Sequence, residues 1–167
     1  MEKNGTYEKG MWLVHTQYGI GKIKGIDVKD ISGEDTRYYR IKTNNSTFWI
    51  PVDQMDSEEL RPLSTQEEIQ LAIATLQKPP KEMSSNYKER QKNIQNARIR
   101  NTPQSMARVV RDLRERRRNK GPLNTTERSA YHTLKERLIE EWSMVTGHRI
   151  EKITSKVDSL LNPQTTQ

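Results

Sequence analysis

The stretch Thr102–Lys120, with the sequence TPQSMARVVRDLRERRRNK, predicts an α-helix with two unlike faces. Thr102 is a candidate N-cap residue followed by a proline, and the Gly121-Pro122 pair beyond the stretch is a helix stop signal. Four apolar residues share the i, i+3, i+4, i+7 spacing of a core-facing stripe: Met106, Val109, Val110 and Leu113. Six arginines are expected on the remaining surface: Arg108, Arg111, Arg114, Arg116, Arg117 and Arg118. This surface is either a solvated charged face or a binding site for phosphates.

The positive charge of the chain is concentrated around this helix. Residues 78–128 hold 15 Lys/Arg and 5 Asp/Glu, a net charge of +10, whereas residues 1–77 hold 9 and 12, a net charge of −3. Residues 129–167 hold 5 of each, so the whole chain has a formal net charge of +7. The distribution predicts an anionic partner for the middle of the chain and a different partner for its front.

The sequence on both sides of this helix also has helical spacing. Ser64-Thr65-Gln66-Glu67 and Asn124-Thr125-Thr126-Glu127 have the spacing of capping boxes, and the helix that the second one begins is expected to end at Gly147. Ser84 is the predicted cap of another helix, and a last helix is expected from Ile150 to Leu161. Residues 78–83, KPPKEM, are predicted to form an exposed loop. The core of this region is expected to include Val109, Val110, Leu113, Leu134 and Trp142.

The front of the chain has the pattern of short β-strands. Four runs rich in β-branched and aromatic residues are separated by turn residues: Met11–Val14, Gly19–Ile26, Arg37–Lys42 and Thr47–Val52. Gly19 and Gly21 are followed by more strand rather than a helix, so they predict bends in a curved sheet and not a nucleotide loop. Residues 53–63 are expected to be a connection.

The predicted fold class is therefore α+β. A small Tudor/SH3-like antiparallel β-barrel at residues 1–62, with a flexible leader at 1–9, is followed by an all-α C-terminal domain of about five helices at residues 63–161 and a flexible tail at 162–167. With only 31% hydrophobic residues, two small cores fit the composition better than one large core.

Several classes of function lack their sequence signals. The chain has no cysteine, and its three histidines have no recognised metal-ligand spacing. No nucleophile motif occurs, and no run approaches the roughly 18 apolar residues of a membrane span. The N-terminus has no apolar signal-peptide region. We therefore expect a cytoplasmic protein that is not an enzyme, with no cofactor, no metal and no membrane partner.

An ordered set of motifs resembles one known family. The front motifs are GMWLVHTQYGIGKIKGID at residues 10–27, RYYRIK at 37–42, WIPVDQ at 49–54 and LRPL at 60–63. The back motifs are Tyr87-Lys88 and ARVVRDLRERRRNKGPLNTTERSAYHTLKERLIEE at residues 107–141. From about Gly10 to Leu161, the chain resembles the CarD/CdnL family of bacterial RNA-polymerase-binding transcription regulators.

The resemblance implies a role for each part of the chain. The Tudor-like domain would dock on the RNA polymerase β subunit through an exposed strand edge. The helical domain would contact promoter DNA at the upstream edge of the transcription bubble and stabilise the open complex. Lys29 and Trp49 match polymerase-contacting positions, although the second is arginine in some relatives. Lys88 and Arg128 match DNA-contacting positions, and Met83 stands where the family commonly has a tryptophan that wedges into melted DNA.

Together, charge and resemblance predict a monomer that binds double-stranded promoter DNA through phosphates without reading its sequence, and that is associated with the nucleoid. The candidate phosphate contacts are Lys88, Arg90, Arg114, Arg117, Arg118 and Arg128. Two alternatives remain open. The protein could be an RNA-binding or ribosome-associated basic protein, or a protein-interaction adaptor whose basic face binds an acidic partner.

Overall fold

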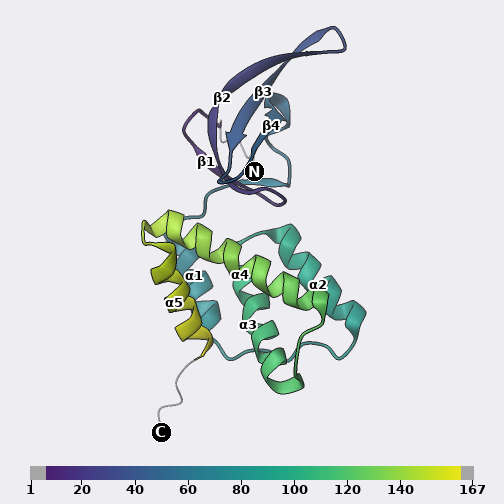
Figure 1. Ribbon diagram of the computed structural model, residues 1–167, viewed down its shortest axis with the longest axis vertical. Helices are drawn as coiled ribbons and strands as arrows, with labels where there is room; N and C mark the ends of the chain where they lie inside the picture. Colours follow the sequence, from purple (N-terminus) through teal and green to yellow (C-terminus); the bar gives the residue numbers. More distant parts are fainter. Residues whose placement is uncertain (1–6, 163–167) are drawn as a thin grey trace. The chain divides into compact units, whose positions relative to one another are not determined.

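The computed structural model describes residues 7–162 of the chain. The chain divides into two compact units, Met1–Leu63 and Ser64–Gln167, here called the N-terminal domain and the helical domain. The first contains an antiparallel five-stranded sheet and the second contains five α-helices (Figure 1). The predicted α+β class is therefore confirmed. Most of the predicted leader and tail, at residues 1–6 and 163–167, lies outside the described residues.

The sheet of the N-terminal domain has the strand order β4-β3-β2-β1-β5. Its strands are β1 (Trp12–His15), β2 (Gly19–Ile31), β3 (Glu34–Lys42), β4 (Thr47–Pro51) and β5 (Leu60–Pro62). Every neighbouring pair is antiparallel, and β1 lies between β2 and β5. A short 3-10 helix, η1 (Val52–Gln54), follows β4. Residues 53–63, which were predicted to be a connection, therefore contain a fifth strand.

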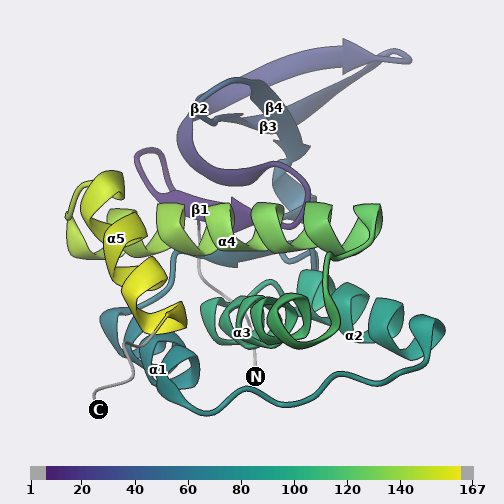
Figure 2. The ribbon, with the colours of Figure 1, turned by 60° about the horizontal axis from the view of Figure 1, so that its bottom comes forward.

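The hairpin of β2 and β3 extends beyond the strands beside it. The pairing of β1 with β2 ends at Lys22, and that of β4 with β3 ends at Tyr38, whereas β2 and β3 continue to pair as far as Ile31 and Glu34. The extension is visible in Figure 1. A register shift between Ile23 and Gly25 accompanies the sharp bend of β2 (Figure 2), because a β-bulge bends the strand that carries it.

The interior of the N-terminal domain is a small apolar cluster. Its buried members are Leu13, Ile23, Ile41, Phe48, Met55 and Leu60. Tyr7 packs against this cluster, and its backbone carbonyl accepts a hydrogen bond of 2.7 Å from the Tyr39 hydroxyl. The backbone N–H of Gly10 donates to the Ile23 carbonyl. Residues 7–9 are thus part of the folded domain, and the prediction that they belong to a flexible leader is wrong, because Tyr7 covers apolar surface.

Five helices form the second domain: α1 (Gln66–Gln77), α2 (Tyr87–Arg100), α3 (Pro103–Lys120), α4 (Thr125–Thr146) and α5 (Ile150–Leu161). The predicted caps at Thr102 and Asn124 are confirmed, since each side chain accepts a hydrogen bond from a backbone N–H of the first turn. The capping box beginning at Ser64 is wrong by one residue, because Thr65 caps α1 by accepting from the Glu68 N–H. The predicted end at Gly147 is also confirmed. The prediction for Ser84 is wrong, because Asn86 caps α2.

Helix α3 is central to the helical domain. It packs against α1, α2 and α4, while α5 packs against α1 and α4. Figure 2 views α3 nearly end-on, between α1 and α2 and with α4 lying across it. The predicted stripe residues Met106, Val109, Val110 and Leu113 are all buried, as are Leu134 and Trp142. None of the helices described is both long and apolar enough to cross a membrane.

Candidate functional site

Lys29 and Trp49 lie together on the outer face of the sheet. Strand register places Trp49 of β4 opposite Arg40 of β3, and Lys29 of β2 opposite Thr36. The Lys29 Nζ lies 3.7 Å from the centroid of the Trp49 ring, which is the geometry of a cation–π contact. Trp49 is 40% exposed, so much of its ring remains accessible on the surface. The sequence separates these two residues by 20 positions, and the sheet brings them into contact.

Asp27 of β2 is hydrogen-bonded to the Trp49 side chain of this pair. Its Oδ2 accepts a hydrogen bond of 2.8 Å from the Trp49 indole Nε1, and its Oδ1 accepts one of 2.7 Å from the Arg40 Nη1. These contacts lower the pKa of the Asp27 carboxyl group, first through the indole hydrogen bond and then through the hydrogen bond and positive charge of Arg40. Asp27 and Arg40 were not among the predicted site residues. Their side chains share a face with Lys29 and Trp49 only because of the strand register.

Strand β4 lies at one edge of the sheet. It pairs with β3 and with no other strand of the described chain. One row of its backbone N–H and carbonyl groups is therefore available to an additional strand, as β-augmentation requires. Trp49 is carried by this same strand.

The arginines of α3 are in unlike environments. Arg111 is buried, where its Nε donates to Asp112 at 2.9 Å and its Nη1 donates to the Thr75 carbonyl at 3.0 Å. The prediction of an outward Arg111 is therefore wrong, because this side chain ties α3 to α1. In contrast, Arg117 and Arg118 near the end of α3 are exposed. Only part of the predicted cationic face is available to a partner.

Arg90, a predicted phosphate contact, is also buried, with 6% of its surface exposed. Its Nε donates to Glu127 Oε1 at 2.8 Å, and its Nη1 donates to the carbonyls of Ser84 and Ser85. The Nε of Arg116 lies 3.8 Å from the other oxygen of Glu127. Glu127 thus connects α2, α3 and α4. Because Arg90 is buried and donates to Glu127, Ser84 and Ser85 inside the domain, it is not available as a phosphate contact.

The other predicted cations remain at the surface. Lys88, Arg117, Arg118 and Arg128 are exposed, while Arg114 is partly buried and donates to the side chain of Asn162. Arg117 also lies over the Tyr131 ring, at 5.4 Å from its centroid. The Arg90–Glu127 pair links the start of α2, which carries Lys88, to the start of α4, which carries Arg128. We call the four exposed residues Lys88, Arg117, Arg118 and Arg128 the cationic surface.

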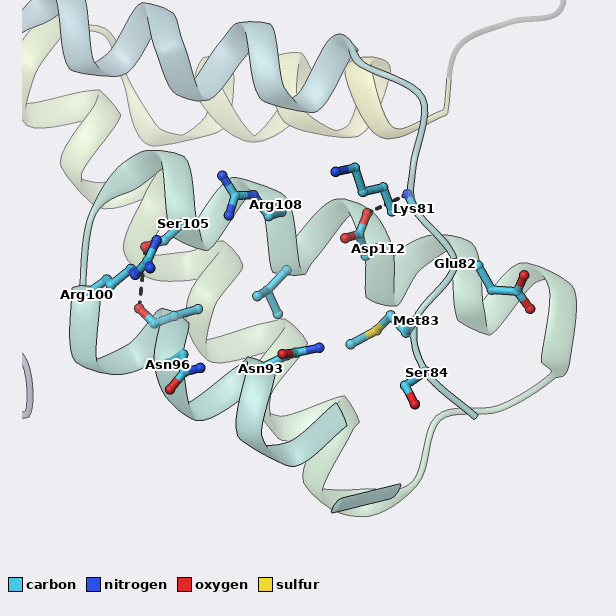
Figure 3. Close-up of a pocket in the computed structure, with 12 residues that line it drawn as sticks. Lys81, Glu82, Met83, Ser84, Asn93, Asn96, Arg100, Ser105, Arg108 and Asp112 are labelled. Carbon is cyan, nitrogen blue, oxygen red and sulfur yellow. Dashed lines mark hydrogen bonds between the residues drawn. The ribbon is translucent and has the colours of Figure 1, made fainter. Parts of the chain in front are cut away.

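Met83 is partly buried on the segment that joins α1 to α2. It packs against the core of the helical domain and lines a groove of about 360 Å³. Figure 3 shows its side chain directed toward Asn93, between the segment and the helices. The backbone N–H of Lys81 donates to Asp112 at 3.0 Å, which ties the segment to α3. Met83 would have to leave this groove in order to enter DNA.

The described residues contain no cluster of potential metal ligands. Within residues 7–162, no group of three His, Cys, Asp or Glu side chains is placed to hold a metal ion. His15 is buried, and its Nδ1 accepts hydrogen bonds from the backbone N–H groups of Gln17 and Tyr18. This histidine therefore has a structural environment in the turn after β1.

Comparison with known proteins assigns both domains. A family model described as the CarD-like/TRCF RID domain matches residues 7–64, and one described as the CarD C-terminal domain matches residues 71–158. No match was found among curated proteins. The second model alone covers more than half of the chain, and the two models follow one another in the order of the two domains.

Proposed function

Because the chain belongs to the CarD family of RNA-polymerase-interacting transcription regulators, we propose that it docks on the polymerase β subunit and contacts promoter DNA. The N-terminal domain would bind the polymerase through β4 and the Lys29–Trp49 pair. The helical domain would bind DNA through the cationic surface and stabilise the open complex. The observation that carries the proposal is the division of α3 into a buried apolar stripe and an exposed cationic end.

The polymerase part of the proposal is supported by two features of β4. Its edge is open to an added strand, and it carries an exposed tryptophan. Backbone pairing at a sheet edge provides affinity, while an adjacent side chain provides specificity. Tryptophan is also enriched among the residues that dominate the energy of protein interfaces.

The DNA part is supported by the chemistry of the exposed cations. Guanidinium groups donate two parallel hydrogen bonds to phosphate, and such contacts position a protein on DNA without reading the bases. Non-specific binding of this kind typically has a dissociation constant on the order of 10⁻⁴–10⁻⁶ M. Tethering to the polymerase would raise the local concentration of DNA enough to make this weak contact effective. The protein would work as a monomer associated with the nucleoid.

Open-complex lifetime on a promoter tests the proposal. We expect the full chain to lengthen this lifetime, Trp49→Ala to abolish the effect by preventing docking, and Arg117→Ala with Arg118→Ala to reduce it. The matched control is Lys152→Ala with Lys156→Ala, which removes the same two charges from exposed positions of α5. Equal effects of the two double variants would contradict a specific role for the cationic surface.

A competition experiment addresses the nature of the anionic partner. Binding of labelled duplex DNA is challenged with duplex DNA, structured RNA and a polyacidic peptide. We expect duplex DNA to compete best per unit of charge. Stronger competition by RNA would favour an RNA-binding protein, and stronger competition by the peptide would favour an adaptor.

A further inference from the structure

The outer face of the N-terminal domain contains side chains that hold one another in place. Asp27 on β2 accepts hydrogen bonds from both Trp49 on β4 and Arg40 on β3. We propose that Asp27 is a positioning residue, which fixes the indole and the guanidinium in one arrangement before a partner binds. The proposal rests on the proposed function, in which Trp49 contacts the polymerase.

Trp49 and Asp27 lie on strands that are not neighbours in the sheet. Because β3 lies between β2 and β4, the Trp49 side chain must reach across β3 to donate its only N–H group to Asp27. The register places Trp49 opposite Arg40 and places Asp27 opposite Tyr38, two residues away on β3. The hydrogen bond therefore selects one orientation of an indole that is otherwise 40% exposed.

Lys29 and Arg40 lie beside the Trp49–Asp27 hydrogen bond. Lys29 lies 3.7 Å from the centroid of the Trp49 ring, and its own backbone is two residues from Asp27 on the same strand. The Arg40 guanidinium lies over Gly25, where a Cβ atom would be 3.2 Å from its Nη2. Asp27 contacts both Trp49 and Arg40, so removing it frees the indole N–H and takes the carboxylate away from the Arg40 guanidinium.

Holding Trp49 in one orientation before binding favours the affinity for a partner. Immobilising an exposed side chain on binding typically weakens affinity by about twofold to tenfold. A tryptophan already held by Asp27 avoids part of this cost, so Asp27 favours binding without touching the partner. The same contact would be unnecessary if Trp49 served only to cover the sheet.

The test is a double-mutant cycle on the full chain, with binding to core RNA polymerase as the readout. We expect Asp27→Ala to weaken binding about threefold to tenfold, the size of the cost of immobilising one exposed side chain on binding. In the Trp49→Phe background, which keeps a ring but removes the indole N–H, Asp27→Ala should have a clearly smaller effect. Asp30→Ala removes a carboxylate from the same strand and is the matched control.

The outcomes separate this proposal from the proposed function. If Trp49→Ala binds the polymerase like the unmodified chain, the docking site itself is wrong. If Trp49→Ala weakens binding but Asp27→Ala has the same effect in both backgrounds, or none, the positioning role is wrong and docking stands.

A measurement on the free protein provides an independent readout. The Trp49 indole N–H signal in a nitrogen–proton correlation spectrum is assigned by its loss in Trp49→Phe. We expect Asp27→Ala to shift this signal and to speed its exchange with water, while Asp30→Ala leaves it unchanged. An indole signal that is indifferent to Asp27→Ala would overturn the proposal, and circular dichroism confirms that each variant is folded.

Discussion

Arg90 and Glu127 form an ion pair in which both side chains are buried. Both side chains are largely hidden from solvent, and the Arg90 Nη1 also donates to the carbonyls of Ser84 and Ser85 before α2. Breaking such a pair leaves one buried charge without its partner, which costs far more than losing an exposed pair. The role of Arg90 is therefore to hold the start of α2 against α4.

Arg90→Ala tests this role. We expect the free energy of unfolding, measured by urea denaturation, to fall by about 3–5 kcal/mol, because Glu127 would stay buried with only the more distant Arg116 beside it. Lys88→Ala, an exposed neighbour on the same helix, should change it by less than about 0.5 kcal/mol. A similar loss in both variants would contradict a structural role for Arg90.

Gly21 is a second residue whose identity follows from close packing. A Cβ atom added there would lie 2.6 Å from the Ile41 Cγ2, in the middle of the small apolar cluster. We expect Gly21→Ala to lower the free energy of unfolding by about 1–3 kcal/mol through overpacking. Gly25→Ala should cost less, because its Cβ would meet only the end of the Arg40 side chain, at 3.2 Å rather than 2.6 Å. Thermal unfolding of both variants measures the difference, and equal losses would contradict this packing argument.

The pH dependence of the Asp27 cluster has a definite sign. Hydrogen bonding by Trp49 and Arg40 lowers the pKa of Asp27 in the folded chain. A group with a lowered folded pKa stabilises the fold above its unfolded pKa, and the contribution is lost as the pH falls through the folded value. We therefore expect the Trp49 indole signal to stay unchanged down to the pKa of an ordinary aspartate and to move only below it. A change of the indole signal centred at or above that pKa would contradict a hydrogen bond from Trp49 to the Asp27 carboxylate.

Helix α3 combines a buried apolar stripe with the exposed cations that the proposed function assigns to DNA binding. Its apolar stripe is buried against three other helices, while the exposed Arg117 and Arg118 lie in its last turns. The two roles can be separated by mutation because the side chains concerned point in different directions. Substitutions in the stripe should change stability, and substitutions at the cationic end should change DNA affinity.

We expect Arg117→Ala with Arg118→Ala to weaken binding to all duplex sequences alike, and to lower the salt dependence of the binding constant by about one unit of slope per lost phosphate contact. Fluorescence anisotropy at several salt concentrations measures both quantities. The control Lys152→Ala with Lys156→Ala should leave the slope unchanged. A sequence-dependent loss of affinity in the Arg117/Arg118 double variant would argue for contacts to bases rather than phosphates.

Leu113→Ala, in the buried stripe of α3, should instead cost about 2–5 kcal/mol of unfolding free energy.

The molecule consists of two domains with separate apolar cores. Among residues 7–63, the apolar cluster of the N-terminal domain has six buried members, whereas that of the helical domain includes residues from all five helices. Because small domains bury a smaller fraction of their surface, the N-terminal domain should be the less stable of the two. Under the proposed function, each domain would carry one of the two binding activities on its own core.

Expression of residues 64–167 without the N-terminal domain tests this division. We expect the fragment to fold, as judged by circular dichroism, and to keep the DNA affinity of the full chain while losing polymerase binding in a pull-down. The open-complex effect should disappear, because the tether is gone. Retention of polymerase binding by this fragment would place the docking surface on the helical domain.

What the sequence determined by itself was local. The limits of α3, the caps at Thr102 and Asn124, and the strand runs around Trp12 and Phe48 depend on neighbours a few positions away, so spacing and capping residues were enough to predict them. The motifs that resemble the CarD family are of the same kind, because they are read along the chain. The net charge of residues 78–128 likewise needed no structure.

Only the tertiary structure decided which charged residues are available to a partner. Arg90 is buried because Glu127, 37 positions away, accepts its hydrogen bond, and Arg111 is buried because Thr75 of α1 lies beside it. Strand β5 exists because β1 offers it a free edge, and Asp27 meets Trp49 across β3. Helical spacing distinguishes an apolar stripe from a charged face, but it cannot show which charges find a buried partner, because that partner is set by long-range packing.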